Sequence, residues 1–226
     1  MSSIFDSSEN VIHLGYFLLG GTHIGIISLW CRHISWLLGL RWNIHGIHKL
    51  DNKKSFIMVA NHQSSLDLLG MFEIIHYLQF PMTIMTRLRV ILISPLGLAM
   101  WLSGIVLLKP QQTMSDLKTN IYGRDNINNN MIMWNFPEIK TGIGDKIQKF
   151  DKHAFSFAIE DDLPIVPVVF GSYKKIFDDD QKYFNTGYVN ITILPEIRTE
   201  NLYREDVNDL IKSVKTTMIK QTNEDL

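Results

Sequence analysis

Cysteine is almost absent from this chain, since Cys31 is the only one in 226 residues. A disulfide needs two cysteines, so a secreted domain held together by internal disulfides is excluded. Charge of one sign is also lacking, because 22 Lys and Arg stand against 23 Asp and Glu. With no basic block, we expect no nucleic-acid partner. The Gly-x-Ser-x-Gly motif is missing too, which argues against a serine hydrolase.

Charged residues are missing from a long stretch near the N-terminus. Residues 11–31 contain no Lys, Arg, Asp or Glu, and about 20 apolar residues can cross a bilayer as a helix. We therefore expect residues 1–42 to anchor the chain in a membrane, with the rest of the chain on the cytosolic side. Four glycines and two histidines interrupt the run. A hydrophobic helix pair that lies in one leaflet, or packs on the domain, is the alternative.

Beyond this segment, short apolar runs alternate with longer segments of helical character. Most of the runs are continuously apolar, as expected for strands buried on both faces of a parallel sheet. This alternation predicts an α/β domain over residues 43–226, with helices flanking a largely parallel sheet. The predicted strands span residues 55–60, 104–109, 131–136, 164–170 and 188–194, and helical segments include 66–78 and 152–161.

Two other segments have a less definite pattern. Residues 90–108 carry no charged side chain, but Pro95, Gly97 and Gly104 interrupt them. These breakers favour a buried or membrane-grazing helix followed by a strand, with a second membrane span as the alternative. The segment from Thr199 onward is predicted to be a polar, partly helical tail.

Polar side chains follow three of the predicted strands. Asn61 and His62 follow the first, Lys109 the second and Glu138 the third. In an open parallel sheet, ligands bind beyond the carboxyl ends of the strands. We therefore expect the functional site at this edge.

His62 and Asp67 are five positions apart, which on a regular helix is a rotation of about 140°. They can meet only if His62 lies in the turn and Asp67 in the first helical turn, with Ser64 or Ser65 as the N-cap. In that geometry the carboxylate fixes the imidazole tautomer and leaves the other ring nitrogen free to take a proton from a hydroxyl. The alternative is a His–Asp pair that only stabilises the turn.

The residues around this pair belong to a longer series of motifs. NHQSSLDLLG closely resembles the first motif block of the glycerolipid acyltransferases, in particular the animal 1-acylglycerol-3-phosphate acyltransferases. TRLRVILISPLGLAMWLSGIVLLK resembles the second block, WNFPE the start of the third and LPIVPVVFGSY the fourth. The four blocks occur in the expected order between Gly46 and Tyr173.

The resemblance implies transfer of an acyl group from acyl-CoA to lysophosphatidic acid, giving phosphatidic acid and CoA. His62 would be the general base and Asp67 would orient it. No resident cofactor or metal is implied, because acyl-CoA is a co-substrate. The family suggests a location in the endoplasmic reticulum membrane, with the catalytic domain facing the cytosol. Further roles in substrate binding or site organisation are implied for Asn61, Arg87, Lys109, Glu138, Lys140 and Pro167.

The third block departs from the family pattern. After Glu138 the chain has Ile139, Lys140 and Thr141, where the family has Gly-Thr-Arg. The missing arginine would hold a phosphate with two parallel hydrogen bonds, a task that suits a planar guanidinium. Lys140 carries a positive charge one position before the place of the family's arginine. Two other interpretations therefore stay open: a lipid-binding relative without catalysis, and an acyltransferase for another lysophospholipid.

Overall fold

The structure is a computed structural model that describes residues 22–51, 55–78, 82–87, 106–108, 132–138, 147–178 and 182–224. The strands are β1 (Leu40–His45), β2 (Phe56–Ala60), β3 (Met82–Arg87), β4 (Val106–Leu108), β5 (Ile132–Asn135), β6 (Ile165–Phe170), β7 (Phe177–Asp178), β8 (Tyr183–Phe184) and β9 (Gly187–Ile193). The helices are α2 (Thr22–Leu37), α3 (Asp67–Leu78), α7 (His153–Glu160) and α8 (Val207–Glu224), with short 3-10 turns η1 (Ile47–Leu50) and η2 (Arg204–Asp206).

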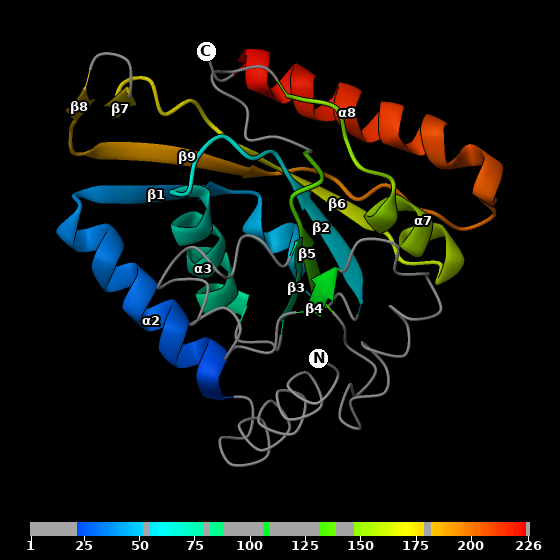
Figure 1. The fold of residues 1–226 in the computed structure, drawn as a ribbon, viewed down its shortest axis with the longest axis horizontal. Helices are drawn as coiled ribbons and strands as arrows, with labels where there is room; N and C mark the ends of the chain where they lie inside the picture. Colours follow the sequence, from blue (N-terminus) through cyan, green and yellow to red (C-terminus); the bar gives the residue numbers. More distant parts are fainter. Residues whose placement is uncertain are drawn as a thin grey trace, which may run out of the picture.

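Seven of the described strands form one sheet in the order β1-β9-β6-β2-β5-β3-β4 (Figure 1). Neighbouring strands pair in parallel, except that β6 and β9 pair antiparallel. The prediction of an α/β domain with a largely parallel sheet is therefore confirmed. The five apolar runs correspond to β2, β4, β5, β6 and β9. Most of the second uncharged run lies outside the described residues.

Helices cover both faces of the sheet, α2 and α3 on one side and α7 and α8 on the other (Figure 1). Because side chains alternate along a strand, β2 contributes to both cores. Phe56, Met58 and Ala60 belong to the core under α2 and α3. Ile57 and Val59 belong to the core under α7 and α8. Burial on both faces explains why the sequence of this strand is continuously apolar.

Gly70 lets α3 lie close against the sheet. A Cβ atom at this position would lie 2.7 Å from Cε1 of Phe170 and 2.9 Å from Cδ1 of Ile191, closer than packed carbon atoms allow. Only a residue without a side chain fits there. This close approach holds the first turn of α3, which contains Asp67, beside the carboxyl end of β6.

The described part of the predicted anchor packs onto the domain. The predicted boundary after residue 42 falls inside β1, and α2 packs against α3, with Arg32 Nε 3.0 Å from Glu73 Oε2. Cys31 lies on the buried face of α2, and burial raises the pKa of its thiol to about 11. Residues 11–21 lie outside the described residues. Among the helices that the structure does describe, none combines the length and apolarity needed to cross a bilayer.

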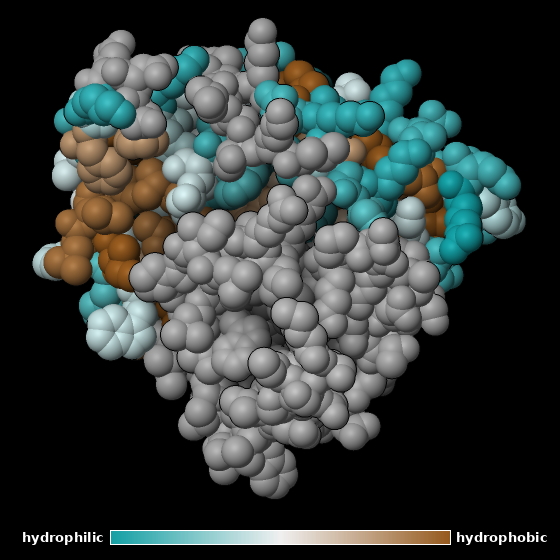
Figure 2. All heavy atoms as spheres, in the orientation of Figure 1, coloured by the Kyte–Doolittle hydropathy of each residue, from teal (hydrophilic) through white to brown (hydrophobic). Residues whose placement is uncertain are grey.

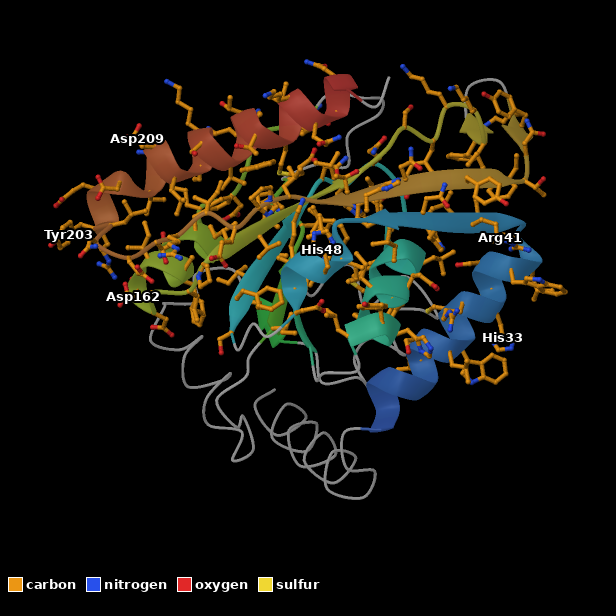
Figure 3. The ribbon with its side chains drawn as sticks, turned by 180° about the vertical axis from the view of Figure 1, so that it is seen from behind. His33, Arg41, His48, Asp162, Tyr203 and Asp209 are labelled. Atoms are coloured by element: carbon orange, nitrogen blue, oxygen red, sulfur yellow. The ribbon has the colours of Figure 1, made fainter. Side chains whose placement is uncertain are left out.

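The predicted polar tail contains a regular helix. α8 is 18 residues long, and its buried residues recur at helical spacing: Val207, Leu210, Val214 and Met218. These side chains complete the core on the α7 side of the sheet. In Figure 3, which views the molecule from behind, Tyr203 and Asp209 mark the region where α8 begins.

Candidate active site

The loop between β2 and α3 places His62 and Asp67 together, as predicted from their spacing. Nδ1 of His62 lies 2.9 Å from Oδ2 of Asp67. The His62 side chain is 25% exposed, whereas the Asp67 side chain is fully buried. Asp67 is the first residue of α3 and His62 lies in the preceding turn, as predicted. Because α3 begins directly after Leu66, neither Ser64 nor Ser65 is the N-cap that was predicted.

The Asp67 carboxylate is also fixed by the backbone of the same loop. Oδ2 accepts hydrogen bonds from the backbone N–H of Gln63, at 2.7 Å, and of Ser64, at 2.9 Å. An ionised carboxylate is stabilised by such charge-assisted bonds. Its contact with Nδ1 favours the tautomer in which Nδ1 carries the proton. Nε2 of His62 makes no hydrogen bond with any described residue, so it is free to accept a proton from a ligand.

Phe136 sets the plane of the His62 imidazole. Phe136 follows β5, and its ring centroid lies 4.5 Å from that of His62, with 31° between the ring planes. The Phe136 ring in turn contacts Trp134 and Phe170. The imidazole is therefore held on one side by a carboxylate and on one face by an aromatic ring that is anchored in the core.

Glu138 organises the site through the backbone of His62, as expected for a residue at the end of the third predicted strand. Oε1 of Glu138 accepts from the His62 N–H at 2.9 Å, and Oε2 accepts from the Gln148 N–H at 2.9 Å. Burial raises the pKa of Glu138, and the two backbone hydrogen bonds oppose that shift. One carboxylate thus joins the end of β5, the loop before α7 and the turn that carries His62.

Asn61 makes a different kind of contact from the predicted one. Its Nδ2 donates to the carbonyl of Phe170 at 3.1 Å, and its Oδ1 accepts from the Phe170 N–H at 2.8 Å. Gln63 Nε2 also donates to the Phe170 carbonyl, at 2.8 Å. The Asn61 residue is only 3% exposed. Its amide therefore ties the end of β2 to the end of β6, and substrate binding by Asn61 finds no support in these contacts.

Of the other predicted substrate-binding residues, Pro167 is the one whose side chain lies among the described residues. Pro167 lies within β6, paired with Val59 inside the sheet. Arg87 is the last residue of β3, but the placement of its side chain is not described. Lys109 and Lys140 lie outside the described residues.

The sequence interpretation missed Tyr173, which contacts the site from the loop after β6. Its hydroxyl donates to Oδ1 of Asp67 at 2.6 Å, and the residue is buried. Tyr173 ends the fourth motif block, LPIVPVVFGSY. Its position just beyond a predicted central strand, together with its hydroxyl group, is a signal that could have identified Tyr173 as a site residue.

The sequence of this chain matches a known protein family and several individual proteins. Residues 41–171 match the family described as Acyltransferase. The 1-acyl-sn-glycerol-3-phosphate acyltransferase alpha of Homo sapiens is 30% identical over 200 residues, covering 86% of this chain and 68% of that protein. The 1-acyl-sn-glycerol-3-phosphate acyltransferase of Saccharomyces cerevisiae is 31% identical over 193 residues, covering 83% of this chain and 62% of that protein.

A solved structure shares the fold. The crystal structure of the 1-acyl-sn-glycerophosphate (LPA) acyltransferase of Thermotoga maritima aligns with a TM-score of 0.65, covering 95% of this chain and 94% of that chain at 15% identity. The family match covers more than half of the chain, and it includes His62, Asp67 and Glu138. The chain therefore belongs to the acyltransferase family, in its 1-acyl-sn-glycerol-3-phosphate acyltransferase group of transferase enzymes.

Proposed function

We propose that this enzyme transfers an acyl group from acyl-CoA to the free hydroxyl of lysophosphatidic acid, giving phosphatidic acid and CoA. The observation that carries the proposal is the His62–Asp67 pair, with Nδ1 held at 2.9 Å from a buried carboxylate and Nε2 uncommitted among the described residues. Such a pair can deprotonate an alcohol without a nucleophile from the protein. The names of the sequence relatives support glycerolipid acyl transfer as the reaction class.

The proposed reaction follows from the two ring nitrogens of His62. Nε2 takes the proton of the acceptor hydroxyl as its oxygen attacks the thioester carbonyl carbon. The bond between that carbon and sulfur then breaks, and the CoA thiolate leaves and receives the proton from His62. The negative charge of Asp67 stabilises the imidazolium that exists between these steps. No acyl-enzyme is formed.

The proposal is tested by following product formation in membranes that contain the full chain. Labelled acyl-CoA and lysophosphatidic acid are supplied, and labelled phosphatidic acid is measured against membranes that contain the His62→Ala variant. Product above that background supports the proposal. If acyl transfer occurs only to other lysophospholipids, the acceptor of this enzyme is one of those and not lysophosphatidic acid. Absence of transfer to every acceptor tested would favour a lipid-binding relative without catalysis.

The altered third block provides a separate prediction about the acceptor phosphate. Replacing Ile139-Lys140-Thr141 by Gly-Thr-Arg is expected to lower KM for lysophosphatidic acid by roughly tenfold, because a guanidinium binds phosphate through two charge-assisted hydrogen bonds. KM for acyl-CoA should not change. An unchanged KM for lysophosphatidic acid would indicate that another cation, such as Arg87, Lys109 or Lys140, already fills this role.

We also propose that α2 lies in the membrane interface. Its outward face carries apolar side chains that are 40–74% exposed: Leu29, Trp30, Ile34, Trp36 and Leu37. Figure 2 shows a hydrophobic patch, in brown, over the region where α2 lies in Figure 1. The opposite face, with Ser28, Cys31 and Ser35, is buried. An amphipathic helix with such a face binds at the boundary between headgroups and acyl chains.

Trp30, Trp36 and Trp42 are spaced by six residues in the sequence, and two of them fit a membrane-facing α2. Trp30 and Trp36 are 67% and 64% exposed. Trp42 instead packs edge-on against Phe170, with ring centroids 6.5 Å apart, and its Nε1 donates to Ser35 Oγ at 3.1 Å. His33 projects from the outer side of α2 (Figure 3), and its Nδ1 lies 2.8 Å from the Leu29 carbonyl oxygen. In the family, the endoplasmic reticulum is the expected membrane.

Changing both Trp30 and Leu37 to serine is expected to weaken binding to phosphatidylcholine vesicles by about 10²–10⁴-fold, since burial of each large apolar side chain contributes about 1.5–3 kcal/mol. Flotation of the purified full chain with vesicles measures this binding. A matched control changes two other exposed large residues to serine, Tyr203, which precedes η2, and Ile219 of α8. Equal binding by both double variants would argue against α2 as the membrane-facing element.

A further inference from the structure

Tyr173 is a buried polar group that the proposed reaction does not yet use. The loop after β6 carries it against α3, where its hydroxyl donates to Oδ1 of Asp67 at 2.6 Å. The residue is 5% exposed, and its ring belongs to the core under α2 and α3. Burial, together with the negative charge of Asp67, raises the pKa of Tyr173 well above its usual value. Its hydroxyl therefore keeps its proton, and can donate, around neutral pH.

The backbone around Tyr173 is held by hydrogen bonds of its own. The Tyr173 carbonyl accepts from the N–H of Ile176 at 2.7 Å and from the N–H of Phe177 at 2.8 Å. Just before it, the Gly171 N–H donates to the Asn190 carbonyl at 2.9 Å. The hydroxyl is thus presented from a turn that is attached to β9. Because this turn is held by hydrogen bonds, the direction of the Tyr173 hydroxyl is fixed.

The two oxygens of Asp67 have separate partners. Oδ2 accepts from His62 Nδ1 and from the Gln63 and Ser64 backbone N–H groups. Among the described residues, Tyr173 is the donor to Oδ1. A partial rotation of the carboxylate about its Cβ–Cγ bond would break the hydrogen bonds of both oxygens. Without the tyrosine hydroxyl, Oδ1 would be a buried acceptor with no described partner, and the carboxylate would lose its restraint on that side.

We propose that Tyr173 is a positioning residue for acyl transfer: its hydroxyl fixes the Asp67 carboxylate so that Oδ2 stays on the Nδ1 proton of His62. This role rests on the proposed function, in which His62 is the base. Tyr173 acts through Asp67 and does not touch the substrate. The chain of contacts therefore runs from Tyr173 to Asp67, from Asp67 to Nδ1 of His62, and leaves Nε2 directed at the acceptor hydroxyl.

The Tyr173→Phe variant of the full chain tests this role, because it removes one oxygen and keeps the buried ring. We expect kcat to fall about tenfold, the effect of losing about one hydrogen bond in the transition state, with KM for both substrates unchanged. Tyr188→Phe is the matched control, since Tyr188 is 71% exposed on β9, and it should retain full activity. An unchanged kcat for Tyr173→Phe would overturn the proposal.

A double variant separates positioning from simple stabilisation. In an Asp67→Ala background, the Tyr173→Phe change should cause no further loss of kcat, because the side chain through which Tyr173 acts is gone. Losses that multiply in the double variant would mean that Tyr173 acts independently of Asp67, which contradicts the proposal.

A third readout does not depend on turnover. The Nδ1 proton of His62 should give a low-field NMR signal in the unmodified chain, and Tyr173→Phe should broaden it through faster exchange with water. If lysophosphatidic acid is not a substrate but the signal responds in this way, the proposed function fails and the positioning role stands. A signal that is equally sharp in both proteins would overturn the positioning role itself.

Discussion

Replacement of His62 by alanine is expected to lower the rate of acyl transfer by about 10²–10⁴-fold, the contribution of a positioned general base. The imidazole is held by Asp67, by the ring of Phe136 and, through its backbone, by Glu138. Alanine keeps the backbone contact with Glu138 and removes the group that takes the proton. The His62 side chain is partly exposed, so its removal should leave the protein folded. Initial rates of phosphatidic acid formation measure the effect.

His48→Ala is the matched control for this experiment. His48 is an exposed residue of η1 (Figure 3), and its loss should leave the rate within about twofold of the unmodified enzyme, because surface changes away from special features have small effects. If the His62→Ala enzyme kept more than about a tenth of the rate, general-base catalysis by His62 would be ruled out.

The architecture of the sheet was predictable from the sequence where strands are buried on both faces. The run at residues 55–60 is continuously apolar because β2 packs against helices on both sides. β1 escaped prediction because it has a different pattern: its burial alternates along Leu40–His45, and it includes Arg41, Asn43 and His45. Its sequence neither forms an apolar run nor is clearly separate from the hydrophobic segment before it. α8 was predicted only as part of a polar, partly helical tail because most of its residues are polar, although its buried positions recur at helical spacing.

The candidate site was predictable where it is local in sequence. His62 and Asp67 are five positions apart, and a turn before a helix is enough to join them. Asn61 could not be assigned in this way. A polar residue at the end of a strand can face a ligand or a neighbouring strand, and only the pairing of β2 with β6 brings Phe170 to its amide. Tyr173 is 106 residues from Asp67, so its contact depends on the same strand order.

Replacement of Asp67 by asparagine is expected to lower kcat by about 10³–10⁴-fold while the protein stays folded. Asparagine can place its carbonyl oxygen on His62 Nδ1 and on the Gln63 and Ser64 N–H groups, where Oδ2 now lies. Its amide then faces Tyr173, whose hydroxyl can accept a hydrogen bond as well as donate one. The shape and the hydrogen bonds survive, and only the charge is lost.

That loss of charge is what should slow the reaction. When His62 takes the acceptor proton it becomes a cation, and in the unmodified enzyme a fully buried carboxylate lies 2.9 Å away. A neutral amide stabilises that cation far less. Asp67→Ala provides the contrast, since it leaves the loop N–H groups without their acceptor and should destabilise the fold by about 1–3 kcal/mol. Kinetics and thermal unfolding of both variants distinguish the two effects. An asparagine variant with full kcat would mean that Asp67 only stabilises the turn, and that its charge has no part in acyl transfer.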